Sequence, residues 1–295
     1  MSLYNFIQDN KTRWSIRLLC RVLEVARSAY NQWAQAQSTD HETDAVRLTV
    51  HIKAIHRQSR GTYGSPRVHR ELLEQGFKVG RHRVARLLRE NGLSGTPKRR
   101  FRPTTTDSEH ADPIAENLLN RDFTASSPNQ AWVGDITYLH TQSGFVYLAV
   151  LIDLFSRKVV GWALMDHMRT ELCLTALQQA VALRGPPRGL LHHTDRGSQY
   201  TSDAYQAALT ALGATPSMSR KGNCWDNAVS ESFFGTLEQE LVGQVPLWRD
   251  LEAVQGAVSD YIYGFYNSQR RHSTLDYQSP NAFERSHRVL SQAAA

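Results

Sequence analysis

The chain has 295 residues, of which 41% are hydrophobic, and it carries a formal net charge of +6 at neutral pH. This length is sufficient for a sizeable core together with one or two small modules. No stretch approaches eighteen uninterrupted apolar residues and the N-terminus lacks the apolar run of a signal peptide, so we expect a cytoplasmic protein without a membrane span. The three cysteines, Cys20, Cys173 and Cys224, lie far apart, which argues against a disulfide framework and a structural zinc site.

The positive charge is concentrated in one part of the chain. Residues 47–103 contain fifteen basic and three acidic side chains, whereas residues 104–295 contain fourteen basic and twenty acidic ones. A basic block beside an acidic region is typical of a segment that binds a polyanion. A merely solvated basic face is the alternative interpretation.

The N-terminal third is predicted to form two helical hairpins. Residues 15–33 indicate a helix, a turn and a short helix that Ser28 caps. In the basic block, one helix is expected to begin at Ser65 and stop at Gly76, and a second to run from Arg81 to Asn91. We therefore expect a helical hairpin over residues 1–46 and a basic helix-turn-helix domain over residues 47–96.

The second helix of the basic block is expected to present its arginines to solvent. With Val84 and the two leucines facing inward, the arginines would meet phosphates or base edges of DNA. Small helical hairpins also occur in proteins that never touch DNA, but the arginines favour DNA binding. The candidates for DNA contacts here and in the following linker are Arg81, Arg83, Arg86, Arg89, Lys98, Arg99 and Arg100.

Residues 97–121 are rich in Pro, Thr and charge, which is typical of a linker. Three antiparallel strands are predicted over residues 131–140, 145–155 and 158–165. A helix over residues 170–183, a strand over 189–195, a helix that Ser202 caps, a strand over 214–219 and a further helix follow. The order β-β-β-α-β-α-β-α predicts an α/β domain over residues 122–285, with a tail over residues 286–295.

Three acidic residues lie where a carboxylate is unfavourable or exposed to a cleft. Asp135 interrupts an apolar strand, and Asp195 ends a second buried strand. Glu231 lies one turn inside a helix, on the side away from its apolar stripe. Three converging oxygen donors suit Mg²⁺ or Mn²⁺, and two such ions can activate a nucleophile and stabilise a leaving oxygen in phosphoryl transfer.

Spacing alone would not single out these three acids. With 28 acids in 295 positions, roughly three acidic pairs occur by chance at any chosen separation. The setting of each acid discriminates, because the other candidates lie near turns or helix starts, where capping and solvation explain them. These candidates are Asp153, Asp166, Asp203 and Asp226, of which Asp153 is the closest rival as a metal ligand.

Other residues have both a functional and a structural interpretation. His193 is expected to lie on the same face of the strand as Asp195. It is either close to the metal site or a buried structural histidine. Trp225 either stacks on a displaced base or packs the loop down. Arg270 and Arg271 follow an aromatic segment that could support them beside DNA, although a solvated helix end explains them almost as well.

Several motifs resemble those of a known family. "WVGDITYL", "HTDRGSQY" and "GNCWDNAVSESFF", with thirty-five residues between Asp195 and Glu231, resemble the Asp-Asp-Glu signature of the OrfB-type transposases of the insertion-sequence-three family. "YNSQRRHSTLDYQSP" resembles the C-terminal segment of that family. The resemblance covers nearly the whole chain, and several independent motifs occur in order.

The resemblance implies a ribonuclease H-like core, with a mixed five-stranded sheet flanked by helices, behind N-terminal helix-turn-helix modules. It implies that Asp135, Asp195 and Glu231 bind two Mg²⁺ or Mn²⁺ ions per active site. The implied reaction is nicking at the ends of the element, followed by attack of the freed 3′-hydroxyl on another phosphodiester. The implied partners are double-stranded DNA, at the terminal inverted repeats and the target, an OrfA partner or fusion, and further copies of the chain on DNA.

One position departs from the family pattern. Many members carry a Lys or Arg seven residues after the catalytic glutamate, where this chain has Glu238. A second acid there would repel phosphate. Either a nearby base, Arg220 or Lys221, substitutes for it, or binding of the element's end is weakened.

Two other functions are compatible with the same residues. One is a ribonuclease H-like nuclease that hydrolyses DNA without joining it. The other is a DNA-binding regulator whose metal site is inactive, an interpretation that Glu238 makes less remote. The motif context favours the transposase over both.

Overall fold

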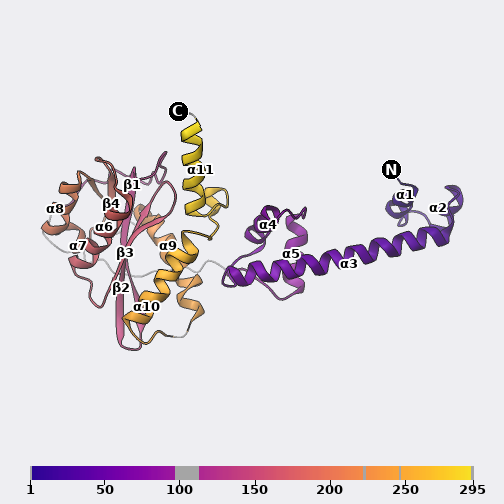
Figure 1. Ribbon diagram of the computed structural model, residues 1–295, viewed down its shortest axis with the longest axis horizontal. Helices are drawn as coiled ribbons and strands as arrows, with labels where there is room; N and C mark the ends of the chain where they lie inside the picture. Colours follow the sequence, from indigo (N-terminus) through magenta and orange to yellow (C-terminus); the bar gives the residue numbers. More distant parts are fainter. Residues whose placement is uncertain (1, 97–112, 222–223, 246, 294–295) are drawn as a thin grey trace. The chain divides into compact units, whose positions relative to one another are not determined.

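The computed structural model describes residues 2–96, 113–221, 224–245 and 247–293, and the chain divides into two compact units, Met1–Gly95 and Thr96–Ala295 (Figure 1). Each unit has its own buried apolar residues. Lys98, Arg99 and Arg100 lie outside the described residues. Among the described residues, none of the helices has the length and apolar character needed to cross a membrane.

The first unit is helical. Its helices are α1 (Leu3–Asn10), α2 (Ile16–Val22), α3 (Arg27–Gln58), α4 (Ser65–Glu74) and α5 (Arg81–Glu90). The helices α1 and α2 contact α3, and the side chains of Ile7, Leu19, Cys20 and Tyr30 form a small core between them. At its other end, α3 contacts α4 and α5.

The long helix α3 differs from the prediction for this region. A short helix capped by Ser28 was expected, but Ala26 occupies the N-cap and the helix continues for 32 residues. The expected boundary between residues 46 and 47 therefore falls inside a helix. Among the residues of α3 whose side chains are described, Leu48, Ile52 and Ile55 form a buried stripe near its C-terminal end. In the sequence, residues 35–44 contain no large apolar residue, so no helical apolar period predicts the full length of the helix.

The basic hairpin forms as its apolar spacing predicts. Val68 and Leu72 of α4 and Val84 and Leu87 of α5 are all buried, at helical spacing in each case. The cap of α4 differs by one position, because Gly64 and not Ser65 is the N-cap, with Pro66 in the first turn. The α4 and α5 helices contact one another and α3, so the three form a small bundle.

The second unit is built on a five-stranded mixed sheet. Its strands are β1 (Ala131–Thr141), β2 (Gly144–Asp153), β3 (Val159–Met165), β4 (Leu191–Thr194) and β5 (Thr215–Met218), in the order β3-β2-β1-β4-β5. The pairs β1–β2 and β2–β3 are antiparallel, whereas β1–β4 and β4–β5 are parallel. The predicted mixed sheet and its order of elements are therefore confirmed.

Helices cover both faces of this sheet. Figure 1 shows α6 (Thr170–Arg184), α7 (Ser198–Thr201) and α8 (Asp203–Leu212) on one side, and α9 (Ala228–Glu240) and α10 (Leu251–Ser259) on the other. The core on the α6 side includes Trp132 and Ile136 of β1. A Cβ atom at Gly161 would lie 2.3 Å from the carbonyl oxygen of Ala176, so this glycine permits the close approach of α6 to β3.

The C-terminal part of the chain returns to the sheet. It contains the 3₁₀ turn η2 (Val242–Gln244), the π-helix η3 (Asp260–Tyr266), the 3₁₀ turn η4 (Ser273–Leu275) and the helix α11 (Pro280–Ala293). The buried side chain of Asn267 accepts a hydrogen bond from the N–H of Val159 and donates one to its carbonyl oxygen. Since α11 continues past residue 286, the expected start of the tail falls inside this helix.

A buried ionic cluster attaches α11 to the end of β2. The Arg184 guanidinium lies 2.8 Å from Glu284 Oε1 and 3.2 Å from Asp153 Oδ2. Lys158 and Ser156 also bind the Glu284 carboxylate. Asp153 accepts two further hydrogen bonds from backbone N–H groups, so its oxygens serve the fold, and the interpretation of Asp153 as a rival metal ligand is not supported.

Replacement of Arg184 by Met tests this cluster. We expect Arg184→Met to lower the free energy of unfolding of the second unit by about 3–5 kcal/mol, because two buried carboxylates lose their shared cation. Urea unfolding at pH 7 measures the change. Arg188→Met, at an exposed position close by, is the control and should change stability by less than about 0.5 kcal/mol. Equal effects of the two substitutions would contradict a stabilising role for the cluster.

Candidate active site

The register of the sheet brings Asp135 and Asp195 to neighbouring positions. In the parallel pair β1–β4, Val133 lies opposite His193. Asp195 follows β4 directly, and its charge acts on Asp135, so the two carboxyl groups are near one another. The charges of both acids also act on Cys173 and Tyr200 of the core on the α6 side. Asp135 is expected on the strand face of Val133, because side chains two residues apart share a face.

Helix α9 covers that face and carries the third acid. It contacts β1 and β2, while Phe233, Phe234 and Leu237 are its buried residues of apolar type. Glu231 lies in the first turn and its side chain is exposed. The helix therefore packs through its aromatic stripe and leaves Glu231 at the border of the packed interface, as the helical spacing predicts.

The three carboxyl groups influence one another electrically. Burial raises the pKa of Asp135 well above its ordinary value of 3.8, and the negative charges of Asp195 and Glu231 raise it further. A hydrogen bond from the N–H of Ile136 to Asp135 Oδ1, at 2.8 Å, acts in the opposite direction but does not cancel these effects. Desolvation also raises the pKa of Glu231. This neighbourhood disfavours three negative charges and favours a cation or a proton.

The turn after β4 orients the Asp195 carboxyl group. The N–H of Gly197 donates a hydrogen bond to Asp195 Oδ1 at 3.0 Å. A Cβ atom at position 197 would lie 3.1 Å from that oxygen and 2.8 Å from Gln199 Oε1. A glycine at this position therefore leaves room for the carboxyl group against the backbone.

In this structure, the side chains of Asp135, Asp195 and Glu231 are not arranged as the ligands of one metal ion. Across residues 2–96, 113–221, 224–245 and 247–293, no group of three or more His, Cys, Asp or Glu side chains is arranged to hold a metal ion. The donor set itself matches a hard cation such as Mg²⁺ or Mn²⁺, because all three donors are carboxylate oxygens. Asp135 and Asp195 lie on or beside strands, whereas the exposed side chain of Glu231 is the one that can move.

A buried carboxylate fixes the start of α9. Asp226, in the 3₁₀ turn η1 (Cys224–Asn227), is fully buried and accepts hydrogen bonds from the Arg220 guanidinium at 2.7 and 2.8 Å. Arg121 and Asn117 also donate to it, each at 2.9 Å. The Arg220 guanidinium holds the pKa of Asp226 well below its usual range. Solvation was expected to explain this acid, but it is instead a buried ion-pair partner.

His193 is a structural residue of the same network. Its ring nitrogens lie 2.8 Å from Ser217 Oγ and 3.1 Å from the carbonyl oxygen of Asp226. Burial lowers the pKa of His193 to about 4, so the ring is neutral at physiological pH. Of the two interpretations of His193, the structure supports the buried structural one.

The two basic residues that precede α9, Arg220 and Lys221, are both exposed. Arg220 is paired with Asp226. Trp225 is 69% exposed although its neighbour Asp226 is buried, so the indole does not pack the loop down. Lys221 and Trp225 are thus presented to solvent six to ten residues before Glu231.

Arg270 and Arg271 are 6% and 8% exposed, which corrects the expectation that they contact DNA. Arg270 Nε lies 2.7 Å from Glu240 Oε2, on α9, and the Tyr261 hydroxyl donates to the same carboxylate oxygen. Arg271 donates to the carbonyl oxygen of Tyr277 at 2.8 Å. In this structure both guanidinium groups bind protein groups, and Arg270 attaches the C-terminal segment to α9.

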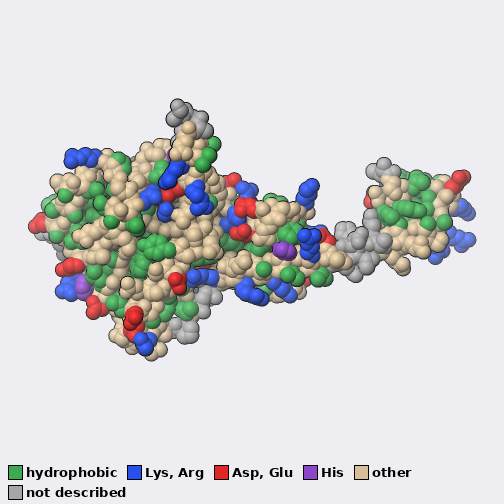
Figure 2. Space-filling model, viewed as in Figure 1, with side chains coloured by type: hydrophobic (Ala, Val, Ile, Leu, Met, Phe, Trp, Pro, Cys, Tyr) green, Lys and Arg blue, Asp and Glu red, His purple; other side chains and the backbone are tan. Residues whose placement is uncertain are grey.

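In the first unit, the arginines of α5 lie outside the buried stripe. Arg81, Arg86 and Arg89 are exposed, and Figure 2 shows Lys and Arg side chains over this bundle. Arg83 is ion-paired with Asp44 of α3 at 2.8 Å. Arg81, Arg86 and Arg89 are therefore placed as expected, whereas Arg83 is half-buried against Asp44. Contact of these arginines with DNA stays a prediction.

Some residues that position the site were missed from the sequence. Arg121 lies in the segment interpreted as a linker, and its partner Asp226 is 105 residues away. The pairing of Glu240 could have been predicted from the sequence. Glu240 lies three residues after Leu237, on the buried side of α9, and a buried acid requires a partner. That partner, Arg270, was instead interpreted as a DNA contact.

The chain matches described protein families over most of its length. The family described as "Integrase core domain" matches residues 125–224, and a second family of that description matches residues 212–280. The family described as "HTH-like domain" matches residues 43–101. These matches cover the sheet with α9 and the bundle with α4 and α5.

Similar proteins cover nearly the whole chain. One is described as "Insertion element IS600 uncharacterized 31 kDa protein" from Shigella sonnei, at 45% identity over 90% of this chain and 97% of that protein. Another is "Transposase InsF for insertion sequence IS3A" from Escherichia coli strain K12, at 42% identity over 95% of this chain and 98% of that protein. A solved structure of the HTLV-2 integrase catalytic core domain in complex with magnesium is 20% identical, with a TM-score of 0.43, and covers 55% of this chain and 99% of that one.

The mixed five-stranded sheet, the acids at its centre and the family matches define an integrase-core protein with an HTH-like domain at its N-terminal side. More particularly, this chain belongs to the transposase family of the insertion sequence IS3, which confirms the resemblance seen in its motifs.

The raised pKa of Asp135 gives a prediction about stability without metal. The unfolded carboxyl group ionises near 3.8, but the folded one resists ionisation to a higher pH, so the folded state loses stability as the pH rises through this window. In the presence of a chelator, Asp135→Asn should therefore be more stable than the wild type at pH 7, and the difference should vanish towards pH 3.8. Urea titrations at several pH values measure it, with Asp166→Asn as an exposed control. A difference that does not depend on pH would contradict the assignment.

The hydrogen bonds of Asp226 give a second prediction. Asp226→Asn removes the negative charge that Arg220 and Arg121 share, so we expect a loss of about 1.5–3 kcal/mol in unfolding free energy. Amide hydrogen exchange over residues 224–231 should also become faster, because the start of α9 loses its anchor. Asp203→Asn, at an exposed helix start, is the matched control. Unchanged exchange in Asp226→Asn would show that other contacts hold the turn.

Proposed function

We propose that this transposase nicks DNA at the ends of its insertion sequence and joins the freed 3′ ends to another DNA molecule, using divalent metal ions. The observation that carries this proposal is the electrical coupling of Asp135 to Asp195 and Glu231. A partly desolvated acid beside two further acids is unfavourable unless a cation or proton compensates. The names of the IS3 relatives support the same reaction.

In this proposal, Asp135, Asp195 and Glu231 hold two Mg²⁺ or Mn²⁺ ions. Such ions would polarise a phosphoryl oxygen and lower the pKa of a bound water or hydroxyl group. The two aspartates provide fixed ligands on adjacent strands, and Glu231 completes the site by a movement of its exposed side chain.

The protein groups contribute position more than covalent chemistry. In the joining step, the oxygen of a 3′-hydroxyl group forms a bond to phosphorus and the bond from phosphorus to the leaving 3′ oxygen breaks. The number of phosphodiester bonds is unchanged, so no external energy source is required. The network of Asp226, His193 and Arg220 supports this step by fixing the turn that leads to Glu231.

Double-stranded DNA is the proposed substrate, at the terminal inverted repeats and at the target. The α4–α5 hairpin presents Arg81, Arg86 and Arg89 for contact with phosphates or base edges. Lys221 and Trp225 would contact DNA next to the acids. We further propose that the protein acts with an OrfA partner or as a fusion with it, and that several copies assemble on DNA. We also propose that the chain divides into five functional segments, residues 1–46, 47–96, 97–121, 122–285 and 286–295.

Conservative replacement of each acid tests the reaction. We expect Asp135→Asn, Asp195→Asn and Glu231→Gln each to reduce nicking and joining by more than about 100-fold, since even outer partners of a metal site typically account for 10- to 100-fold. DNA binding should be retained. The measurement uses labelled element ends with Mg²⁺ or Mn²⁺, with and without OrfA, and Asp166→Asn as the control.

The other outcomes of this assay separate the alternatives. Full activity of Asp135→Asn would refute its assigned role. Cleavage without any joined product would favour the nuclease. Binding of DNA without metal-dependent cleavage, even with OrfA present, would favour a regulator with an inactive metal site.

A further inference from the structure

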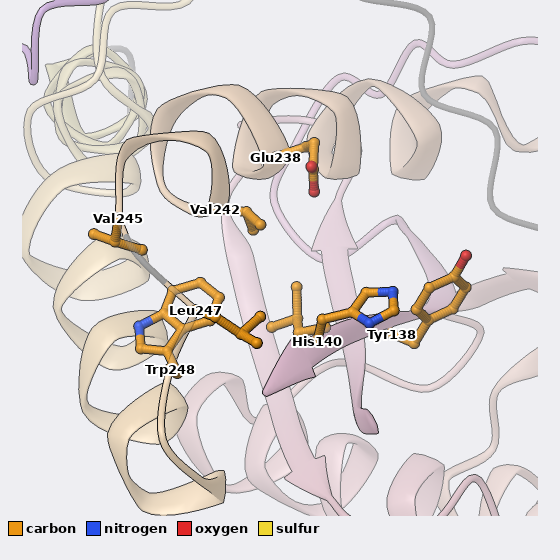
Figure 3. Close-up of a pocket in the computed structure, with 8 residues that line it drawn as sticks. Tyr138, His140, Glu238, Val242, Val245, Leu247 and Trp248 are labelled. Atoms are coloured by element: carbon orange, nitrogen blue, oxygen red, sulfur yellow. The ribbon is translucent and has the colours of Figure 1, made fainter. Parts of the chain in front are cut away.

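Two surface features that the proposed reaction does not use differ in their charge. The first is a pocket of about 260 Å³ at the end of β1 (Figure 3). Its walls combine apolar and aromatic side chains with the carboxylate of Glu238. A carboxylate repels the phosphates of DNA, so this pocket is unsuited to a further DNA contact. The second feature is a basic surface on the N-terminal helices.

The N-terminal module, residues 3–34, has the connections of a helix-turn-helix. The helix α2 ends at Val22, residues 23–26 form a turn, and α3 begins at Arg27. A turn of three or four residues that often contains glycine is usual in this motif, and here Glu24 adopts a φ of 55° in the turn. The match to the HTH-like family covers residues 43–101, which follow this module along the chain.

Packing against α1 fixes which side of α3 faces solvent. Tyr30 is buried, and its hydroxyl group donates a hydrogen bond to Gln8 Oε1 at 2.7 Å. The ring of Trp33 lies 5.9 Å from that of Tyr30 and 5.4 Å from that of Tyr4, measured between centroids. These contacts hold one side of the first turns of α3 against α1. The other side is therefore presented to solvent in a fixed orientation.

The solvent side of these turns consists of side chains that can read bases. It is formed by Arg27, Ser28, Asn31 and Gln32, all of which are exposed. Arginine binds the major-groove edge of guanine through two hydrogen bonds, and asparagine or glutamine binds adenine in the same way. None of the four residues is apolar, whereas the centre of a protein interface is rich in aromatic residues and poor in charge. This side of α3 thus suits DNA better than a protein partner.

The remainder of the module supplies positive charge. Residues 1–35 contain five basic and two acidic side chains, and Figure 2 shows Lys and Arg side chains on the N-terminal helices. The five basic residues are Lys11, Arg13, Arg17, Arg21 and Arg27, and all are exposed. Arg17 and Arg21 are four residues apart, so they share one side of α2.

The two kinds of side chain are divided between the helices as DNA docking requires. In helix-turn-helix proteins, the first helix crosses the DNA backbone, and the N-terminal residues of the second contact base edges in the major groove. In this module, α2 carries the arginines and the N-terminal end of α3 carries the base-reading side chains. The helices α2 and α3 are in contact, so the module can present both sets to one duplex.

We propose that the N-terminal module is a second base-reading site for double-stranded DNA, with the first turns of α3 in the major groove and Arg17 and Arg21 on the phosphates. This inference rests on the proposed DNA substrate and adds to the contacts proposed for the α4–α5 hairpin. Because Arg27 suits guanine while Asn31 and Gln32 suit adenine, the sequence that the module reads contains both kinds of base pair. The protein then recognises its DNA through two helix-turn-helix sites.

Binding of duplex DNA by the full chain, in the presence of a chelator, tests this site. One labelled duplex carries a terminal inverted repeat of the element, and a second carries the same bases in scrambled order. The double variant with Asn31→Ala and Gln32→Ala should bind the terminal repeat at least about tenfold more weakly, because two base contacts are lost. Its affinity for the scrambled duplex should not change. Fluorescence anisotropy measures both affinities, and circular dichroism should show unchanged helix content.

Replacement of a phosphate contact should have a different effect. Arg17→Gln should weaken binding of both duplexes alike, since a phosphate contact carries no sequence information. It should also reduce the slope of the logarithm of affinity against the logarithm of salt concentration by about 0.9. The matched controls are Asn5→Ala, exposed on α1 of the same module, and Arg188→Gln, exposed in the second unit. Neither control should change the affinities or the slope.

Three outcomes would overturn the proposal. The first is an unchanged ratio of the two affinities in the double variant. The second is an equal loss of affinity for both duplexes in that variant, which would assign no base contact to α3. The third is a changed oligomeric state of the double variant without DNA, with the ratio unchanged, since the surface would then join copies of the chain.

The measurement does not depend on cleavage. The variant Asp135→Asn should keep the preference for the terminal repeat, so a failure of the proposed reaction does not imitate a failure of the module. A chain that reads the repeat through α3 but neither nicks nor joins DNA would contradict the proposed reaction alone. Intact nicking and joining, with a preference that the double variant retains, would contradict the role of the module alone.

Discussion

The mutual repulsion of carboxyl groups is the constraint on which the second unit depends. Asp135 lies within a strand whose neighbours are buried, and both Asp195 and Glu231 add to the unfavourable field at its carboxyl group. Such an arrangement persists only if the surrounding fold is stable enough to enforce it. Parallel pairing of β1 with β4 fixes two of the acids, and the packing of α9 on the same face fixes the third within reach. The clustered negative charge favours a cation or a proton at this position.

Compensated charges around the site supply that stability. Asp226 and Glu240 are buried, but each has a guanidinium partner, Arg220 and Arg270 respectively. Asp153 and Glu284 share Arg184 at the end of β2. Acids that are paired with a protein cation maintain the fold. At Asp135, by contrast, burial and the charges of two further acids raise the pKa, which favours a cation or a proton there.

Much of this arrangement was predictable because it follows from local patterns. Apolar segments separated by short turn signals identified the three antiparallel strands, and the helical stripe of Phe233 and Leu237 placed Glu231 away from the core. The setting of Asp135 inside a strand separated it from the acids at turns. What the sequence did not reveal was long-range pairing. Arg121 with Asp226 and Arg270 with Glu240 each join residues that no local period connects, so Arg270 was interpreted as a surface cation. The length of α3 was also missed, because much of the helix lacks a continuous apolar stripe.

The contact between Arg121 and Asp226 determines where the catalytic part of the chain begins. Sequence composition places the end of the linker at residue 121, yet Leu119 is buried and the N–H of Leu118 donates to Ser217 Oγ, the atom that also contacts His193. A fragment cut at residue 122 would thus remove one side of the support for the turn before Glu231 while leaving every strand intact. Such a truncated protein would fold and still hold its glutamate loosely. Fragments intended for biochemistry or crystallisation should therefore retain Asn117, Leu118, Leu119 and Arg121.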